Sequence, residues 1–547
     1  MNQSSDAPKG MMQRILDVVE RVGNLVPHPV LIFLTLIAIV IVLSHILYLA
    51  GVGVGVTYEA IVPEAAAEAE TIDGIDQVYD TGMHVDYEVM DEKNYHIAEQ
   101  SISVRSLLTA EGIRFIYVSL IPNFMSFTAV GLMIAAMVGA GVAEESGLVN
   151  AIIRKLVIVS PRWALIYILS FVGILSSIAA DAGYLVLIPL AGIAFMSVGR
   201  HPLAGLALGF AAVAGAFTVN MLIKPLDAVL VEFTNDAIHL VDPDVSIGLA
   251  SNLWFSIASV VVLTFVLAII TEKIIEPRLG KYDPKLAGDD QPDVQQGALS
   301  ADESRGLKFA SIALLITLGV FGYLTLPANA ILRSPETGEL IGNSPFMNGL
   351  IALIMILFLV TGSAYGFGAR TITSLTGNIK AMEKAMSGLG SLILLFLVLS
   401  QFVAYFNYTN MGTILALKLA EILKAANFPA LLLLIGFIVV VALIDLLITG
   451  AIAKWALFAP IFVPLLMTLS VAPEAVLAAY RVADSPMNTI TPLNAYFALV
   501  VGFAQKYDKS AGVGTVVSLM LPYVVVLFII WTALFAAWQW MGLPWGL

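Results

Sequence analysis

The most informative segment of the sequence runs from Pro429 to Asn494 and reads PALLLLIGFIVVVALIDLLITGAIAKWALFAPIFVPLLMTLSVAPEAVLAAYRVADSPMNTITPLN. It contains apolar runs of membrane length that are interrupted by glycine, proline and a few charged residues. An ionisable side chain in hydrocarbon is costly unless it is paired or hydrated, so such residues face a bundle interior or a water-filled cavity. Non-helical backbone is tolerated at membrane depth only where protein or a cavity satisfies it. Half-helices that meet at a polar gap therefore predict a substrate or ion site.

The composition of the whole chain indicates a polytopic membrane protein. Of its 547 residues, 59% are hydrophobic and 12% are charged, and the mean hydropathy is +0.92. This is about half the charged fraction of soluble domains. The absence of cysteine excludes disulfides, thiol catalysis and thiolate metal sites. The apolar run from Pro29 to about Val54 is too long for the apolar region of a signal peptide, so we expect it to be the first span.

Charge placement predicts the topology. Lys9, Arg14 and Arg21 assign residues 1–27 to the cytoplasm. Residues 51–114 carry 13 Asp or Glu, which predicts an acidic extracytoplasmic loop over 55–112 with a solvated surface. We therefore expect an all-α fold with about nine transmembrane helices plus two re-entrant helical hairpins in an inverted repeat. Its predicted parts are a first half over 28–270 with a hairpin at 163–198, a cytoplasmic linker over 271–306, and a second half over 307–547 with a hairpin at 429–469.

The repeat rests on matching prolines and matching polar breaks. Pro189 and Pro202 are 13 residues apart, and so are Pro460 and Pro473. Each second proline opens a helix of small residues that meets a polar break. The two breaks are Asn220-Met-Leu-Ile-Lys-Pro-Leu-Asp227 and Asn488-Thr-Ile-Thr-Pro-Leu-Asn494. Because the predicted topology places one hairpin inside and the other outside, the pattern is typical of secondary transporters.

The helix after Pro473 carries the most distinctive polar set. Arg481, Asp484 and Asn488 are three and four residues apart and share one helical face. One interpretation is a local Arg481–Asp484 ion pair that neutralises both charges. The other assigns Asp484, Asn488 and Asp445 to a Na+ site or a titrating carboxylate, while Arg481 binds an anionic substrate bidentately. Asp445 also fits a buried, protonated structural acid.

Four further residues are candidates on weaker grounds. Asp181 lies beside Gly183 near the predicted tip of the first hairpin, where a lone acid favours function. Asn220 and Lys224 either complete the site or cap broken helix ends. Trp455 either stacks on an aromatic ligand or anchors a helix end at the membrane interface.

Motifs of other protein classes are missing from the sequence. The six histidines have no metal-binding spacing, and the chain has no phosphate loop, Gly-x-Ser-x-Gly elbow or zinc-protease pattern. ATP-driven transport and familiar hydrolytic chemistry therefore lack support. An intramembrane enzyme that uses paired acids remains a minor alternative, as does a passive channel.

Four blocks resemble the AbgT family, the aminobenzoyl-glutamate transporters. They are Ala180-Asp-Ala-Gly-Tyr-Leu-Val-Leu-Ile-Pro-Leu-Ala191, Gly199-Arg-His-Pro-Leu-Ala-Gly205, Ala453-Lys-Trp-Ala-Leu-Phe-Ala-Pro-Ile-Phe-Val-Pro464 and Tyr480-Arg-x-x-Asp-Ser-x-x-Asn-x-Ile-Thr-Pro492. The resemblance implies a homodimeric transporter of the bacterial inner membrane that imports p-aminobenzoyl-glutamate or exports sulfonamides, with Na+ or H+ as the coupling ion. By motif it marks as transport residues Asp181, Trp455, Pro473, Arg481, Asp484 and Pro492, with Asp484 and Asn488 at the cation site.

The sequence departs from the family pattern at the second hairpin and just after it. Its tip reads Gly450-Ala-Ile-Ala453 instead of a segment rich in small residues that include serine. Asp445 replaces an expected Asn, and Pro486-Met487 replaces Ser-Thr. We expect a cation-coupled transporter of anionic aromatic compounds, in which Arg481 engages a carboxylate and Trp455 the ring. The alternative is a Na+-coupled dicarboxylate transporter or ion exchanger of similar architecture. The expected partners are the substrate, the lipid bilayer and a second copy of the chain, with no nucleic acid and no enzymatic cofactor.

Overall fold

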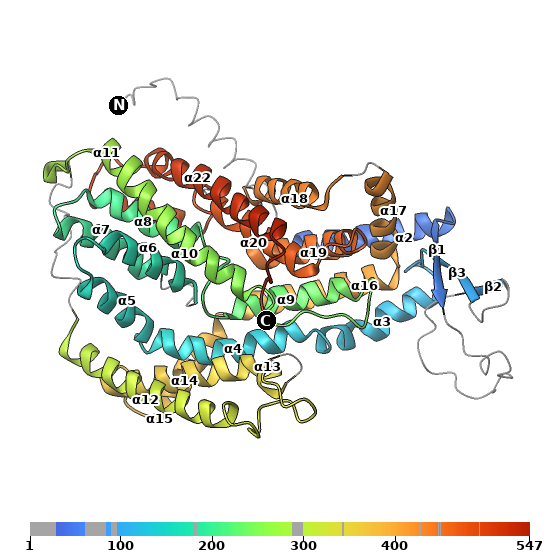
Figure 1. Ribbon diagram of the computed structural model, residues 1–547, viewed down its shortest axis with the longest axis horizontal. Coiled ribbons are helices and arrows are strands. Elements are labelled where there is room, and N and C mark those ends of the chain that lie inside the picture. The colour runs from blue at the N-terminus through green and yellow to red at the C-terminus, as the bar shows by residue number, and fades with distance from the viewer. Residues whose placement is uncertain are drawn as a thin grey trace, which may run out of the picture.

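The computed structural model is an elongated bundle whose helices follow its long axis (Figure 1). It describes residues 29–60, 84–88, 96–178, 183–286, 299–341, 344–425, 428–446, 448, 450–491 and 493–547. The predicted cytoplasmic segment 1–27 and the candidate residues Asp181 and Pro492 lie outside these ranges.

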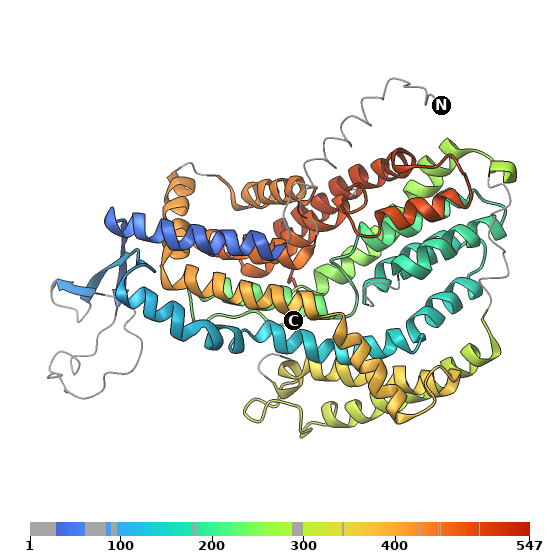
Figure 2. The ribbon, with the colours of Figure 1, turned by 180° about the vertical axis from the view of Figure 1, so that it is seen from behind.

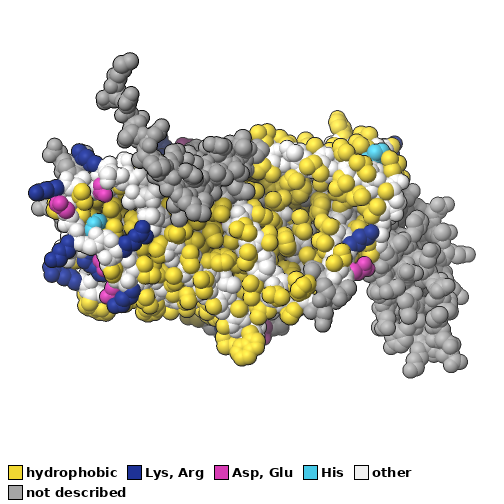
Figure 3. Space-filling view, turned by 90° about the horizontal axis from the view of Figure 1, so that it is seen from above, with side chains coloured by type: hydrophobic (Ala, Val, Ile, Leu, Met, Phe, Trp, Pro, Cys, Tyr) yellow, Lys and Arg dark blue, Asp and Glu magenta, His cyan; other side chains and the backbone are white. Residues whose placement is uncertain are grey.

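Seven helices in the described part of the chain are long and apolar enough to cross a membrane, which takes about 20 residues. They are Pro29–Leu49, Ala110–Glu145, Leu253–Leu279, Ala301–Thr325, Leu350–Ala369, Gly390–Tyr408 and Val513–Trp540. Figure 3 shows hydrophobic side chains over the middle of one face and most of its charged side chains near one end. This pattern fits a multi-pass membrane protein. The predicted count of nine crossings also includes two broken spans, and it stays a prediction.

The first repeat forms a helical hairpin followed by a broken span. Prolines begin the second hairpin helix and both halves of the span, as expected for a residue with no N–H to donate. Its elements are α6 (Leu165–Leu175), η2 (Ser176–Ile178), η3 (Gly183–Leu187), α7 (Ile188–Ser197), α8 (Pro202–Ala214) and α9 (Pro225–Ile238). Helices α6 and α7 both pack on α8. The approach is close, because a Cβ on Gly205 would lie 2.3 Å from the carbonyl oxygen of Ala191.

The second repeat has the same order of elements. They are α18 (Ala430–Asp445), α19 (Ala451–Met467), α20 (Pro473–Met487) and α21 (Phe497–Gln505). Gly450, at the hairpin tip, has φ +102°, a backbone conformation that L side chains rarely adopt. Helix α18 packs on α20, whereas α19 packs on α9 of the first repeat. The second hairpin therefore joins the two repeats. Its insertion into a bilayer as a re-entrant hairpin stays a prediction.

A layer of helices beside this core contains α4 (Thr128–Glu145), α12 (Ala301–Thr325), α14 (Leu350–Ala369) and α15 (Leu375–Ser387), which pack on one another (Figure 1). Small residues allow the close contact. A Cβ on Gly139 would lie 2.3 Å from the Met355 carbonyl oxygen, and one on Gly362 would lie 2.7 Å from the Ala143 Cα. Such contacts are typical of helices that associate inside a membrane.

The remaining helices enclose the core from other sides. Figure 2 shows α2 beside α16, and these two helices are in contact. Helix α10 packs on α6 and α22, and α17 packs on α19. The bounds are α2 (Pro29–Leu49), α3 (Ala110–Met125), α5 (Leu148–Val159), α10 (Leu253–Ile270), η4 (Thr271–Ile275), α11 (Glu276–Leu279), η5 (Pro284–Leu286), α13 (Pro345–Asn348), α16 (Gly390–Tyr408), α17 (Met411–Ala425) and α22 (Val513–Trp540).

The predicted acidic loop 55–112 is not purely irregular, and the fold is not all-α. Strands β1 (Gly53–Ala60), β2 (His84–Glu88) and β3 (His96–Ser103) form an antiparallel sheet in the order β1-β3-β2. The sequence carries a signal for β1, because valine alternates with glycine over 51–56. The alternation overlaps the end of the predicted first span, which runs to about Val54.

The predicted linker 271–306 begins and ends inside helices. Helix α10 continues through the π-helical segment η4 into α11, which ends at Leu279. At the other end, α12 begins at Ala301 with a capping box. Ser300 Oγ accepts a hydrogen bond from Glu303 N (3.1 Å), and Glu303 Oε2 accepts one from Ser300 N (2.7 Å).

His201 caps α8 at the end of the bundle that we predict to be cytoplasmic. Its Nδ1 accepts a hydrogen bond from Leu203 N (3.3 Å), so the cap requires the neutral ring. Burial lowers the pKa of His201, and the carboxylates of Asp508 and Glu276 oppose part of this shift.

We expect His201 to make the protein less stable in acid. The unfolded chain binds the proton more readily, so this stability is present above about pH 6.5 and is lost as the pH falls through the lower folded pKa. The expected loss is about 1 kcal/mol, the usual value of a cap. Thermal unfolding at about pH 7.5 and about pH 5.5 measures it. His201→Asn keeps a capping acceptor, so a His201→Asn protein with the same pH dependence would contradict this assignment.

Candidate functional site

The two broken spans are hydrogen-bonded to each other where they meet. Thr218, between α8 and α9, donates its N–H to Ser485 Oγ (3.0 Å) on α20. The Thr218 hydroxyl donates to the carbonyl oxygen of Arg481 (2.7 Å). All three residues are buried. The two spans thus contact each other through residues that precede each predicted polar break.

Arg481 is committed to partners from the first half of the chain. Its NH1 donates to Asp227 Oδ1 (2.5 Å) and to the Thr218 carbonyl oxygen (2.7 Å), and its Nε donates to Asn252 Oδ1 (3.1 Å). Asp227 lies 254 residues earlier in the chain. The local pair with Asp484 does not form among the described ion pairs. Sequence reasoning missed Asp227, although it ends the first repeated break.

A second charge cluster joins the hairpin to the helix after it. Lys454 Nζ forms an ion pair with Asp445 Oδ1 and lies 2.6 Å from Asp484 Oδ1. All three side chains have 0% exposure. The cluster holds one ammonium group and two carboxylates. Its hairpin residues come from α18 and α19, on either side of the hairpin tip.

The neighbours of Asp484 complete this cluster. Tyr480 Oη lies 3.0 Å from Asp484 Oδ1, and its proton is directed to that oxygen or to the Ala451 carbonyl oxygen. Asn488 Nδ2 donates to the Asp484 carbonyl oxygen (2.9 Å) and lies 3.5 Å from Asp484 Oδ2. Every one of these contacts forms within the second repeat.

The three predicted Na+ ligands, Asp445, Asp484 and Asn488, lie close together in the structure. There is no room for a Na+ ion between the two carboxylates. The Lys454 ammonium fills the position between Asp445 and Asp484. Asn488 directs its amide nitrogen, not its oxygen, towards Asp484. Among the residues that the structure describes, no group of three or more His, Asp or Glu side chains is arranged to hold a metal. Na+ binding at these residues would require the ammonium to move.

Trp455 is packed inside the protein rather than facing a cavity. Its Nε1 donates to the Leu230 carbonyl oxygen (2.9 Å) and to Thr234 Oγ1 (3.0 Å) on α9. Its ring centroid lies 4.5 Å from that of Tyr480. Its side chain is fully buried. The indole therefore connects the two repeats here, and stacking on a ligand stays a prediction.

Asn220 and Lys224 bind the described end of the first hairpin. Asn220 Nδ2 donates to the Leu175 carbonyl oxygen (3.1 Å) and to Ser177 Oγ (3.0 Å). Lys224 Nζ donates to Ser177 Oγ (3.2 Å) and to the Phe217 carbonyl oxygen. Lys224 is also the residue that precedes α9. Pro473, the remaining candidate, begins α20, and its role in transport stays a prediction.

A cavity of about 620 Å³ lies between the hairpins and the adjacent helices, within the usual range for small-molecule sites. Both hairpins line it, Ser177 and Ile178 from the first and residues 450–453 from the second. Lys224 reaches it from the broken span. Glu145 and Lys384 also line it and form an ion pair (2.6 Å). Much of the remaining lining is apolar: Met133, Met137, Phe217, Leu226, Leu392 and Leu395.

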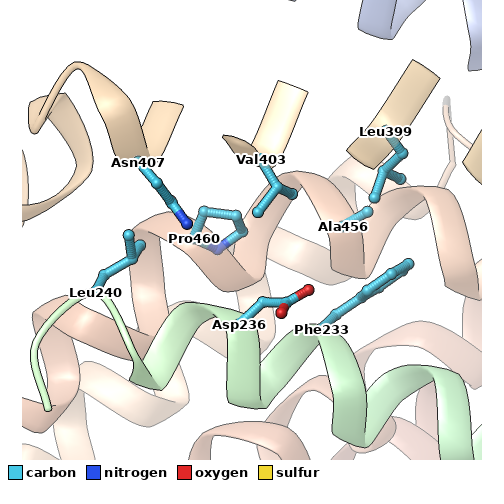
Figure 4. Close-up of a pocket in the computed structure, with 8 residues that line it drawn as sticks. All are labelled: Phe233, Asp236, Leu240, Leu399, Val403, Asn407, Ala456 and Pro460. Atoms are coloured by element: carbon cyan, nitrogen blue, oxygen red, sulfur yellow. The ribbon is translucent and has the colours of Figure 1, made fainter. Parts of the chain in front are cut away.

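Two water-sized pockets lie apart from this cavity. One, of about 10 Å³, is lined by Arg481, Asp227 and Asn252. The other, of similar volume, contains Asp236 and Asn407 (Figure 4). Buried oxygens of both side chains have no hydrogen-bond partner among the described protein atoms. Each pocket has room for one water molecule, which would satisfy such groups.

Comparison with known proteins decides the family. A sequence model of the AbgT putative transporter family matches residues 14–547. The chain belongs to the AbgT family. It is 32% identical to the p-aminobenzoyl-glutamate transport protein of Escherichia coli K12, over 100% of this chain and 98% of that protein. The AbgT family is a family of transporters, so this member is not an enzyme.

Two solved structures of transporters share the fold of this AbgT-family protein. The crystal structure of the Alcanivorax borkumensis YdaH transporter has a TM-score of 0.82 and 37% identity, with 95% of this chain and 100% of that chain covered. The structure of Neisseria gonorrhoeae MtrF, described with a class of antimetabolite efflux pumps, has a TM-score of 0.84 and 37% identity, with 96% and 97% covered. The resemblance found in the sequence motifs is confirmed.

Proposed function

We propose that this AbgT-family protein is a cation-coupled secondary transporter of p-aminobenzoyl-glutamate or related anionic aromatic compounds. The observation that carries the proposal is the cavity of about 620 Å³ that both hairpins line. Such a position, between repeats built from broken helices, is where secondary transporters bind their substrates. The names of the Escherichia coli and Neisseria gonorrhoeae relatives support the substrate class, and the second supports export of antimetabolites such as sulfonamides.

The hydrogen bonds between the two broken spans suggest how the cavity would open to each side of the membrane in turn. Thr218 with Ser485, and Arg481 with Asp227, join the two broken spans. These groups are buried and satisfy one another, so separating them would be costly. The broken spans would therefore move together as one body against the layer that contains α4 and α14. The coupling ion would act at the Asp445, Lys454 and Asp484 cluster, either as H+ on a carboxylate or as Na+ after the Lys454 ammonium has moved away.

The same proposal includes a homodimer in the bacterial inner membrane with the N-terminus in the cytoplasm. It rests on family membership and on the basic residues Lys9, Arg14 and Arg21. A Na+-coupled dicarboxylate transporter or ion exchanger remains the second candidate. The apolar lining of the cavity favours the aromatic substrate over citrate or succinate.

Transport into proteoliposomes tests the function. Radiolabelled p-aminobenzoyl-glutamate is supplied with Na+ and pH gradients imposed separately, and Asp484→Ala is the control. We expect accumulation under one gradient, its loss in the control, and no competition by citrate or succinate. If neither gradient drives p-aminobenzoyl-glutamate or a sulfonamide in either direction, the proposed function is wrong.

A further inference from the structure

We propose that Lys224 is the side chain that anchors the anionic group of the substrate. The inference deepens the proposed function and rests on it. Lys224 is 1% exposed, yet it lines the cavity of about 620 Å³ between the hairpins. A cationic group at this position would select anions from the compounds that enter.

The hydrogen-bond partners of the Lys224 ammonium are neutral. Its Nζ donates to Ser177 Oγ and to the Phe217 carbonyl oxygen, and lies 4.9 Å from the centroid of the Phe217 ring. No described carboxylate forms an ion pair with it. The carboxylates of Asp227 and Asp484 act on the ammonium group without a direct ion pair. A bound anion in direct contact would further offset the cost of burying this charge.

Asp227, the nearest acid in sequence, is already in use. Its Oδ1 accepts from Arg481, and its Oδ2 accepts from the backbone N–H of Lys224 (2.8 Å). The carboxylate thus binds the main chain of Lys224 and leaves the side chain free to point elsewhere. This explains why an ammonium group and an acid three residues apart do not form a direct ion pair.

The other cations near the centre are less suited to bind the substrate in this conformation. Arg481 is paired with Asp227 and faces a water-sized pocket. Lys454 lies between two carboxylates and does not line the large cavity. Lys384 does line it, but this side chain is 69% exposed and pairs with Glu145. Of the described cationic side chains that line the cavity, Lys224 alone has no carboxylate partner.

The surroundings of Lys224 define the class of ligand. The Ser177 hydroxyl donates to the Ile174 carbonyl oxygen (2.9 Å) and accepts from the ammonium group, so the ammonium is the donor that a ligand would meet here. Phe217, Leu226 and Met137 supply apolar surface for a ring. This combination fits a carboxylate attached to an aromatic amide, held by a charge-assisted hydrogen bond.

Equilibrium binding in nanodiscs tests the anchor. The probes are p-aminobenzoyl-glutamate and its neutral diamide, in which both carboxylates are replaced by amides. Wild type is compared with Lys224→Met, Lys224→Gln and Lys224→Arg. Lys308→Met is the matched control, because it removes the same charge from an exposed position on α12.

We expect wild type to prefer the acid over the diamide by about tenfold or more, as a charge-assisted hydrogen bond allows. That preference falls to about twofold or less in Lys224→Met and Lys224→Gln, whereas Lys224→Arg and Lys308→Met retain it. The ratio is taken from whichever neutral variant is monodisperse by size exclusion. If Lys224 had only a structural role, its neutral variants would bind the acid and the diamide more weakly by the same factor.

Two failures remain distinguishable. If wild type binds the acid and the neutral Lys224 variants keep the wild-type preference, the anchor is overturned while the proposed function stands. If wild type binds neither p-aminobenzoyl-glutamate nor a sulfonamide, the proposed function is overturned and the anchor with it.

Discussion

Replacing Lys454 with methionine will lower the free energy of unfolding by about 3–5 kcal/mol, the usual cost of removing one partner from a buried ion pair. The variant leaves Asp445 and Asp484 facing each other with no cation between them. Both carboxylates are fully buried, so water does not screen their repulsion. Unfolding in mixed micelles titrated with a denaturing detergent measures the change.

Asp445→Asn is the matched control for Lys454→Met. It removes a charge from the same cluster but leaves one ammonium group and one carboxylate, Lys454 with Asp484, in contact at 2.6 Å. We expect this variant to lose less than about 1 kcal/mol. The decisive result is a larger loss of unfolding free energy in Lys454→Met than in Asp445→Asn. Equal losses in the two variants would mean that the ammonium group does not hold the two acids together.

Arg481→Ala will reduce transport to background, about a hundredfold or more below wild type. The side chain supplies the hydrogen bonds that tie α20 to Asp227, Asn252 and Thr218, and its loss leaves Asp227 buried without a cation. A loss of this size corresponds to the energy of a buried charged hydrogen bond. Initial rates of uptake into proteoliposomes measure it. Unchanged uptake would reject any role for Arg481 in transport.

Arg481→Lys and Asp227→Asn show how Arg481 acts. Lysine keeps the charge but cannot reproduce a planar fork that reaches three acceptors, so we expect it to fail as well. Asn at position 227 can still accept a hydrogen bond from the guanidinium, so we expect Asp227→Asn to retain more transport than Arg481→Ala. If Arg481 works only by joining the repeats, Arg481→Ala with Asp227→Ala will be no worse than Arg481→Ala alone. If Arg481 instead contacts substrate in another conformation, Asp227→Ala will retain substantially more transport than Arg481→Ala.

The helical elements of the two repeats were largely predictable from sequence. Helices α6 and α7 occupy Leu165 to Ser197 within the first predicted hairpin, and α18 and α19 occupy Ala430 to Met467 within the second. Their re-entrant form stays a prediction. Apolar run length and proline are local signals, and each acts on the few residues around it. The small sheet was missed because its strands are short and two of them lie in an acidic stretch with no strong alternation.

Side-chain partners were much harder to predict. Helical spacing places Arg481 beside Asp484, and this suggested a pair between them. The fold instead presents Asp227 to Arg481 and Lys454 to Asp484. Lys454 stood in a quoted motif, but nothing in its local spacing indicated that it would lie between two acids.

Membership of the AbgT family, a helical membrane fold and the two polar breaks could all be inferred from the amino-acid sequence alone. Those properties depend on composition, on apolar run length and on motifs that are contiguous in the chain. Which charges form ion pairs depends instead on how the helices pack. A buried charge pairs with whichever opposite charge the packed helices bring within reach. For Arg481 that partner comes from 254 residues away, and for Lys224 no described carboxylate takes that place.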